Sequence, residues 1–152
     1  ESFEGLPHRC QPIAQVAGVS YINDSKATNV GATMAALIGL GGSTKDGPPR
    51  IVLIAGGDGK GADFKPLAGL VVRYAQALVL LGRDAPKMAQ ELGDRLDTHQ
   101  VRNMEAAVSV AAGLAAPGDL VLLSPACASL DMYRNFAERG ESFSQAVLEL
   151  AA

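Results

Sequence analysis

The stretch IVLIAGGDGKGADF, residues 51–64, decides the fold of this chain. It begins with an apolar run and continues into a loop in which four glycines surround Lys60. Residues 50–55 share their near-continuous Val, Leu and Ile character with two later runs, ALVLLG at 77–82 and DLVLLS at 119–124. Such runs are typical of parallel strands covered on both faces. These three segments are predicted to form the centre of a sheet.

Helical patterns lie between the predicted strands. Helices are expected at 66–74, where Pro66 suits a first turn, at 85–92, and at 104–115, which the sequence PGD ends. Alternating strands and helices require right-handed crossovers in a mostly parallel sheet. The predicted class is therefore α/β, Rossmann-like, with helices flanking the sheet.

The N-terminal part has a different pattern. Residues 8–24, HRCQPIAQVAGVSYIND, predict an antiparallel hairpin that turns at Ala17 and Gly18. A capped helix is expected from Thr28 or Asn29 to about Leu40, and a surface loop is expected at 39–50. A final helix is expected at about 142–150.

Composition limits the class of protein. The 152 residues, 48% apolar and 19% charged, fit one globular domain. No apolar stretch approaches the roughly 20 residues that cross a bilayer, and the first ten residues lack the order of a signal peptide. A cytoplasmic location is expected. The net charge of -3 and the scattered lysines argue against a nucleic-acid or membrane partner.

The cysteines and histidines predict no metal site. Cys10 and Cys127 are too few and too distant for a disulfide framework, and no cluster has zinc-ligand spacing, so reduced thiols are expected. Cys127 is interpreted as a small buried residue, because His8 and His99 share no motif with it. His99 is expected at the surface, and residues 83–84 are expected to serve a helix start.

Three polar loops follow predicted strands: NDSKATN (23–29), GGDGKGADF (56–64) and SPACASLDMYRNF (124–136). Ligands of open α/β sheets bind beyond the carboxyl ends of the strands, so these loops are expected to share one edge. The glycine stretch is no Walker A motif, because Gly61 follows Lys60 where Ser or Thr is required. It matches the dinucleotide fingerprint only loosely, and Pro66 places the next helix too late for it.

Two interpretations remain open for each of the first two loops. Lys60 and bare backbone N–H groups suit a carboxylate or phosphate oxygen, with glycines that leave room for a ligand; the alternative is a tight turn with a solvated lysine. Residues 23–29 precede a predicted helix whose N-terminus attracts anions. Their alternative is a helix cap.

Four motifs carry a resemblance to a known family: PHR (7–9), NDSKATNVGAT (23–33), LIAGGDGKGADF (53–64) and LLSPACASLDMYRNFAERG (122–140). Together they resemble the C-terminal domain of the bacterial Mur ligases, over essentially the whole chain. Within that family the resemblance is to the UDP-N-acetylmuramoyl-L-alanine:D-glutamate ligases. Ligases that add other amino acids usually have a DYAHxP-like loop in place of NDSKATN, and those adding diaminopimelate carry an Asp-Asn-Pro-Arg signature absent here.

The resemblance implies a three-domain enzyme of which residues 1–152 are the third, amino-acid-binding domain, with the N-terminal and central domains outside this sequence. ATP would phosphorylate the terminal carboxylate of UDP-N-acetylmuramoyl-L-alanine, and the D-glutamate amine would displace phosphate to form an amide in peptidoglycan precursor synthesis. The central domain would bind most of the ATP and Mg²⁺. No catalytic residue is expected in this domain, which alone should be inactive.

The resemblance also implies roles for single residues. Lys60 and Thr28 would hold the side-chain carboxylate of D-glutamate, while Ser129 and the backbone around Phe136 would hold its α-carboxylate. Lys26 would add positive potential.

Arg9 and Asp24 would reach the nucleotide. Two other classes remain possible for the chain, a nucleotide-binding Rossmann module and a non-catalytic interaction domain.

Overall fold

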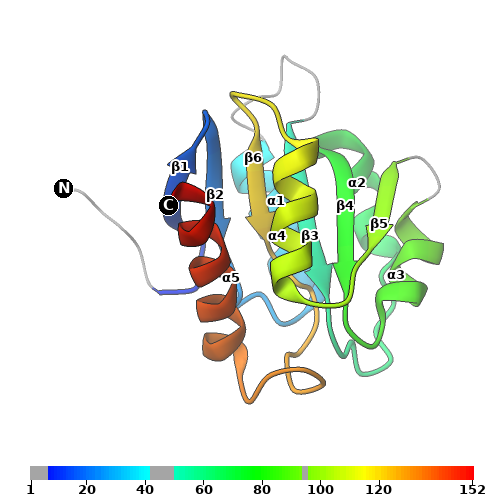
Figure 1. Ribbon diagram of the computed structural model, residues 1–152. Coiled ribbons are helices and arrows are strands. Elements are labelled where there is room, and N and C mark those ends of the chain that lie inside the picture. The colour runs from blue at the N-terminus through cyan, green and yellow to red at the C-terminus, as the bar shows by residue number, and fades with distance from the viewer. Residues whose placement is uncertain (1–6, 42–49, 94–95) are drawn as a thin grey trace.

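A computed structural model describes residues 7–41, 50–93 and 96–152. One six-stranded sheet runs through the molecule (Figure 1). Its strand order is β1 (Gln11–Val16), β2 (Val19–Asn23), β6 (Leu120–Leu123), β3 (Ile51–Gly56), β4 (Ala75–Leu81) and β5 (Asp97–Gln100). Only the β1–β2 pair is antiparallel; every other pair is parallel. The predicted fold class and N-terminal hairpin are confirmed.

Helices cover both faces of the sheet. One face carries α1 (Val30–Gly41), α2 (Ala68–Tyr74) and α3 (Ala85–Leu92), and the other carries α4 (Met104–Leu114) and α5 (Phe136–Ala151), as Figure 1 shows. The central strand β3 alternates between the two cores, with Leu53 in the first and Val52 and Ile54 in the second. Period-2 alternation in a strand with two apolar faces explains the continuous apolar run in the sequence.

The three apolar runs form β3, β4 and β6, which are adjacent at the centre of the sheet as predicted. A short 3₁₀ turn, η2 (Lys65–Leu67), contains Pro66 and leads into α2. Asn29, not Thr28, caps α1, because its Oδ1 accepts a 2.9 Å hydrogen bond from the N–H of Ala32. Of the predicted loop at 39–50, residues 39–41 belong to α1, and residues 42–49 lie outside the described residues.

Two elements differ from the prediction. Strand β5 was not predicted, because its sequence DTHQ is polar, as suits an edge strand paired only with β4. Helix α5 begins at Phe136, six residues before the predicted start. Its cap is Asn135, whose Oδ1 accepts a 2.8 Å hydrogen bond from the N–H of Glu138. Asn followed three residues later by Glu is a helix-start signal that the sequence contained.

Both cysteines are free thiols. Cys127 is fully buried, as predicted, and burial raises the pKa of its thiol to about 12. A thiol protonated at neutral pH is a poor nucleophile. His99 lies on β5 with 38% of its side chain exposed. Within the described part of the chain, no helix is both long enough and apolar enough to span a membrane.

Candidate functional site

Three loops meet at the carboxyl edge of the sheet. We name them the Asp24 loop (residues 24–29, after β2), the glycine loop (57–64, after β3) and the Ser129 loop (124–135, after β6). The Ala126 N–H donates to the Ala27 carbonyl at 3.0 Å, joining the Asp24 and Ser129 loops. Asp58 and Ala128 exchange backbone hydrogen bonds of 3.0 and 2.9 Å, joining the Ser129 and glycine loops. The predicted shared edge is confirmed.

Close packing inside the protein explains most of the glycines. Gly56 and Gly57 have φ of 126° and 133°, and a Cβ on either would collide with a carbonyl oxygen, of Leu81 and of Ala128 respectively. A Cβ on Gly59 would lie 2.6 Å from the Phe64 ring. Of these four glycines, only Gly61 would have open space around an added Cβ. Of these four glycines, Gly61 is therefore the one that leaves room for a ligand, as the sequence interpretation expects. The other three are explained by packing within the protein.

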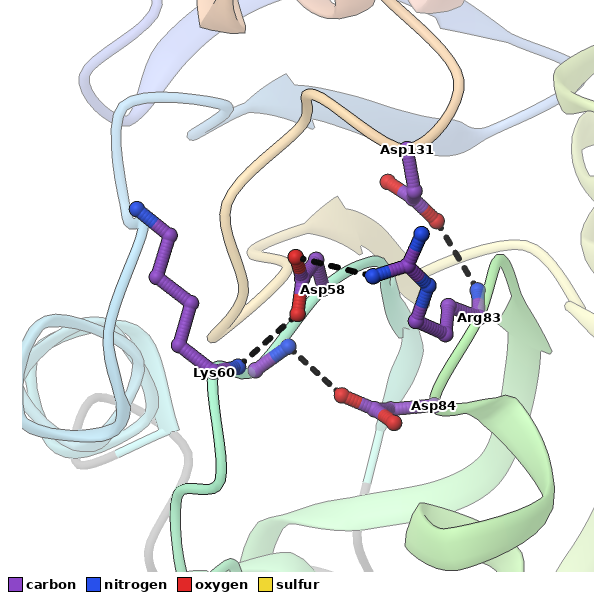
Figure 2. Close-up of polar contacts among 6 residues, drawn as sticks. Asp58, Lys60, Arg83, Asp84 and Asp131 are labelled. Atoms are coloured by element: carbon purple, nitrogen blue, oxygen red, sulfur yellow. Dashed lines mark hydrogen bonds and ion pairs between the residues drawn. The ribbon is translucent and has the colours of Figure 1, made fainter.

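Lys60 lies at the exposed tip of the glycine loop. Its φ is 53°, and its backbone N–H donates a 2.9 Å hydrogen bond to Oδ1 of Asp58. Figure 2 shows its side chain extending away from the carboxylates of Asp58 and Asp84. No acceptor for the Lys60 ammonium occurs within residues 7–41, 50–93 and 96–152, so this cation is available to a ligand.

Residues 83–84 do more than begin a helix. Asp84 occupies the N-cap position of α3, but its side chain makes no cap hydrogen bond. Its Oδ2 instead accepts a 2.6 Å hydrogen bond from the N–H of Gly59 (Figure 2). The Arg83 guanidinium lies 3.3 Å from Oδ2 of Asp58, and the Arg83 N–H donates to Asp131 at 2.8 Å. The predicted place at a helix start is confirmed, since Asp84 is the N-cap residue of α3, and both residues also connect this helix to two loops.

Asp24 lies at the wall of an open hollow. Its carboxylate is buried and accepts hydrogen bonds from the Cys10 N–H at 3.0 Å and the Ser124 hydroxyl at 2.8 Å. Burial raises the pKa of Asp24, and these two hydrogen bonds oppose the rise. The hollow, of about 400 Å³, is also lined by Arg9 and Lys26. The structure thus brings both residues assigned to the nucleotide, with Lys26, around one cavity.

The Ser129 loop leads into α5. Ser129 is buried, and Phe136 is the first residue of the helix. The Lys26 ammonium lies 5.4 Å from the centroid of the Phe136 ring, and His8 contacts the same ring edge-on at 6.2 Å. Phe136 is also tied to the Asp24 loop, since the Ser25 hydroxyl donates a 2.7 Å hydrogen bond to its carbonyl. Lys26 and Phe136 therefore lie together at the junction of two loops.

Several polar groups at this edge have no hydrogen-bond or ion-pair partner among the described residues. Among them are the Lys60 ammonium and the hydroxyls of Thr28 and Ser129. Polar groups at the carboxyl edge of an α/β sheet that the protein leaves unpaired are candidates for ligand contacts.

Arg139 and Asp84 were missed from the sequence as residues that organise this edge. Arg139 is 3% exposed and belongs to the buried face of α5, together with Phe143 and Ala146. The spacing i, i+4, i+7 would have placed it on that face had the helix start been predicted. No sequence signal connects Asp84 to Gly59, because their contact depends on how two neighbouring strands end.

The site does not fit a resident metal ion. In the part of the chain that the structure describes, no group of three or more His, Cys, Asp and Glu side chains could hold one. Mg²⁺ prefers several oxygen ligands in octahedral geometry. The described residues can therefore contribute cations and hydroxyl groups to a ligand, but they do not form a set of metal ligands.

Comparison with known proteins adds an independent finding. Residues 8–127 match the family model for the Mur ligase, glutamate ligase domain. The chain is 57% identical over 151 residues to UDP-N-acetylmuramoylalanine--D-glutamate ligase of Pseudomonas aeruginosa, covering 99% of this chain and 33% of that protein. It is 53% identical over 152 residues to the ligase of the same name from Saccharophagus degradans, covering 100% and 32%. The chain thus spans about a third of the length of these relatives.

A solved structure has the same fold. A murein peptide ligase from Psychrobacter arcticus superposes with a TM-score of 0.68 at 12% identity, covering 99% of this chain and 31% of that one. At this identity the similarity supports the fold alone.

Proposed function

This chain belongs to the Mur ligase family, and from that premise we propose that it is the D-glutamate-binding domain of a ligase that extends UDP-N-acetylmuramoyl-L-alanine. Mur ligases act in peptidoglycan synthesis. The proposed reaction transfers the γ-phosphoryl group of ATP to the terminal carboxylate of the UDP-linked substrate. The D-glutamate amine then attacks the acyl carbon, phosphate leaves, and an amide bond forms.

One observation carries the proposal. Lys60, Thr28 and Ser129 come from three different loops, yet these loops are hydrogen-bonded to one another at a single edge. Their cation and hydroxyls lack partners among the described residues. A dianionic amino acid requires two separated sets of donors for its two carboxylates. In the proposal, Lys60 and Thr28 form one set, and Ser129 with the backbone around Phe136 forms the other.

The proposed binding mode assigns a role to each group. Lys60 and Thr28 hold the side-chain carboxylate of D-glutamate, and Ser129 with the backbone around Phe136 holds the α-carboxylate. Lys26, beside Phe136, adds positive potential to the same region. The amine is left without a protein anchor and can attack. The contribution of this domain to catalysis is positioning, which can lower a barrier by several kcal/mol, at most about 7 to 11 in well-oriented model reactions.

The nucleotide is proposed to contact the hollow beside the amino-acid site. Arg9 is exposed at its rim, and Asp24 forms part of its wall. The described residues do not fit a Mg²⁺ site. We therefore assign to this chain only the contacts of Arg9 and Asp24, and leave the binding of Mg²⁺ and most of ATP to other parts of the ligase.

Substrate kinetics test this proposal. In the presence of Mg²⁺, UDP-N-acetylmuramoyl-L-alanine and D-glutamate, the full-length ligase that contains this chain should release phosphate from ATP. With L-glutamate in place of D-glutamate, it should release much less phosphate. The 152-residue chain alone should release none above background. A full-length enzyme that ignores D-glutamate would overturn the substrate assignment, and turnover by the 152 residues alone would overturn the proposed division of labour.

A further inference from the structure

The guanidinium of Arg139 is a buried cation whose direct hydrogen-bond partners are all uncharged. Its Nε donates to the Ser25 hydroxyl at 3.0 Å, its Nη2 to the Ser25 carbonyl at 2.8 Å, and its Nη1 to the Cys127 carbonyl at 2.9 Å. The side chain is 3% exposed. No carboxylate in the described parts of the chain forms an ion pair with it. Buried charges are usually paired, so this one needs an explanation.

The charge is present at neutral pH. Burial lowers the pKa of Arg139 to about 10, and electrostatic interactions with Cys127 and Asp131 act in the opposite direction. A guanidinium with this pKa remains protonated at pH 7. Because the surroundings are shielded from water, its field reaches nearby groups with less screening than a surface charge would have.

Arg139 also holds two loops at a fixed separation. Ser25 belongs to the Asp24 loop and Cys127 to the Ser129 loop, so the planar fork of the guanidinium spans the gap between them. The Ser25 hydroxyl, which accepts from Nε, passes the connection on to the Phe136 carbonyl at 2.7 Å. Arg139 and Ser129 further line the same small cavity beneath the loop.

We propose that Arg139 is a positioning residue for the α-carboxylate of the amino-acid substrate, acting through Ser25, Phe136 and the Ser129 loop. This inference rests on the proposed function. The fork fixes the groups that would hold the carboxylate, and its charge favours an anion at their surface. If Arg139 only stabilised the fold, its loss would instead weaken the binding of every ligand at this edge to the same degree.

The test uses four variants of the full-length ligase, with KM for D-glutamate and for ATP measured separately. Arg139→Met removes the charge and the fork, and Arg139→Lys keeps the charge alone. Ser25→Ala keeps the guanidinium but removes the hydroxyl that connects it to Phe136. Arg134→Met is the matched control, because Arg134 lies just before the same helix but is 87% exposed and pairs with Glu138.

The expected result is a selective loss. Arg139→Met should raise KM for D-glutamate about ten-fold or more, since hydrogen bonds to a charged group are lost. Arg139→Lys should show a smaller rise of KM for D-glutamate than Arg139→Met. Ser25→Ala should raise the same KM about three- to ten-fold. KM for ATP should change less than two-fold in each, and Arg134→Met should match the wild type in both.

Two results would overturn the inference. One is an unchanged KM for D-glutamate in Ser25→Ala and Arg139→Lys; the other is a parallel rise of both KM values. Where Arg139→Met fails to fold, the milder Ser25→Ala decides. A wild-type enzyme that does not use D-glutamate would refute the proposed function itself, which separates that failure from a failure at Arg139.

Discussion

The carboxylate of Asp84 accepts a 2.6 Å hydrogen bond from the backbone N–H of Gly59, 25 residues earlier in the chain. A second bond runs in the reverse direction, from the Asp84 N–H to the Gly57 carbonyl at 2.9 Å. Gly59 directly precedes Lys60, so these bonds fix the backbone from which the Lys60 side chain leaves. The start of α3 thereby sets the position of the glycine loop.

Replacing Asp84 should therefore affect both stability and substrate use. Asp84→Ala removes a charged acceptor, which should lower the free energy of unfolding by about 1.5 to 3 kcal/mol. It should also raise KM for D-glutamate several-fold, because the loop carrying Lys60 loses an anchor. Asp84→Asn keeps an acceptor oxygen, so it should show a smaller loss of stability and a smaller rise of KM for D-glutamate. Urea unfolding and steady-state kinetics measure the two effects, and an Asp84→Ala enzyme equal to wild type in both would contradict this role.

The glycine loop offers a second prediction, on stability alone. Gly57→Ala would bring a Cβ against the Ala128 carbonyl at a φ of 133°, and should lower the free energy of unfolding by roughly 3 kcal/mol. Gly69 in α2 is the control, since a Cβ there meets nothing within 4 Å. Gly69→Ala should stabilise the protein by about 0.5 to 1 kcal/mol. Equal urea midpoints for the two variants would show that the close approach at Gly57 is unimportant.

Much of the sheet was predictable because its central strands are buried on both faces. The alternation of Val52 and Leu53 between two cores leaves a continuous apolar run, which is typical of parallel strands buried on both faces. The meeting of the three loops at one edge followed from the parallel arrangement of these strands. Strand β5 was not predictable by the same rule, because an edge strand with the sequence DTHQ has little apolar face.

The contacts that organise the site were less accessible from the sequence. Asp84 and Gly59 meet because β3 and β4 are neighbours and end at the same level, which depends on register. Arg139 is charged, and charged residues are seldom buried, so its residue type alone predicts an exposed position. The proposed ligand contacts of Lys60, Thr28, Ser129 and Phe136 remain predictions, supported by their common edge.

The hollow beside Asp24 leads to a prediction about the nucleotide. Arg9 is exposed at this hollow and distant in sequence from the glycine loop. In the full-length enzyme, Arg9→Ala should raise KM for ATP about ten-fold, by loss of a charge-assisted contact, with a smaller change for D-glutamate. Separate titrations of the two substrates measure this split. A rise of KM for D-glutamate at constant KM for ATP would show that Arg9 has been assigned to the wrong ligand.

Lys60 offers the most direct test of the proposed D-glutamate site. Its ammonium has no partner among the described residues, so its removal should leave the melting temperature nearly unchanged. A lost charge-assisted hydrogen bond of about 1.5 to 3 kcal/mol corresponds to one to two orders of magnitude in kcat/KM for D-glutamate. Lys65→Ala is the control, because Lys65 is also exposed and lies five residues further along the chain.

The decisive measurement is kcat/KM for D-glutamate of Lys60→Ala beside Lys65→Ala, in the full-length ligase at saturating ATP and UDP-N-acetylmuramoyl-L-alanine. We expect a fall of about ten- to one-hundred-fold for Lys60→Ala, at an unchanged melting temperature, and wild-type kinetics for Lys65→Ala. A Lys60→Ala enzyme with the wild-type kcat/KM would contradict the assignment of this edge to the carboxylate of D-glutamate.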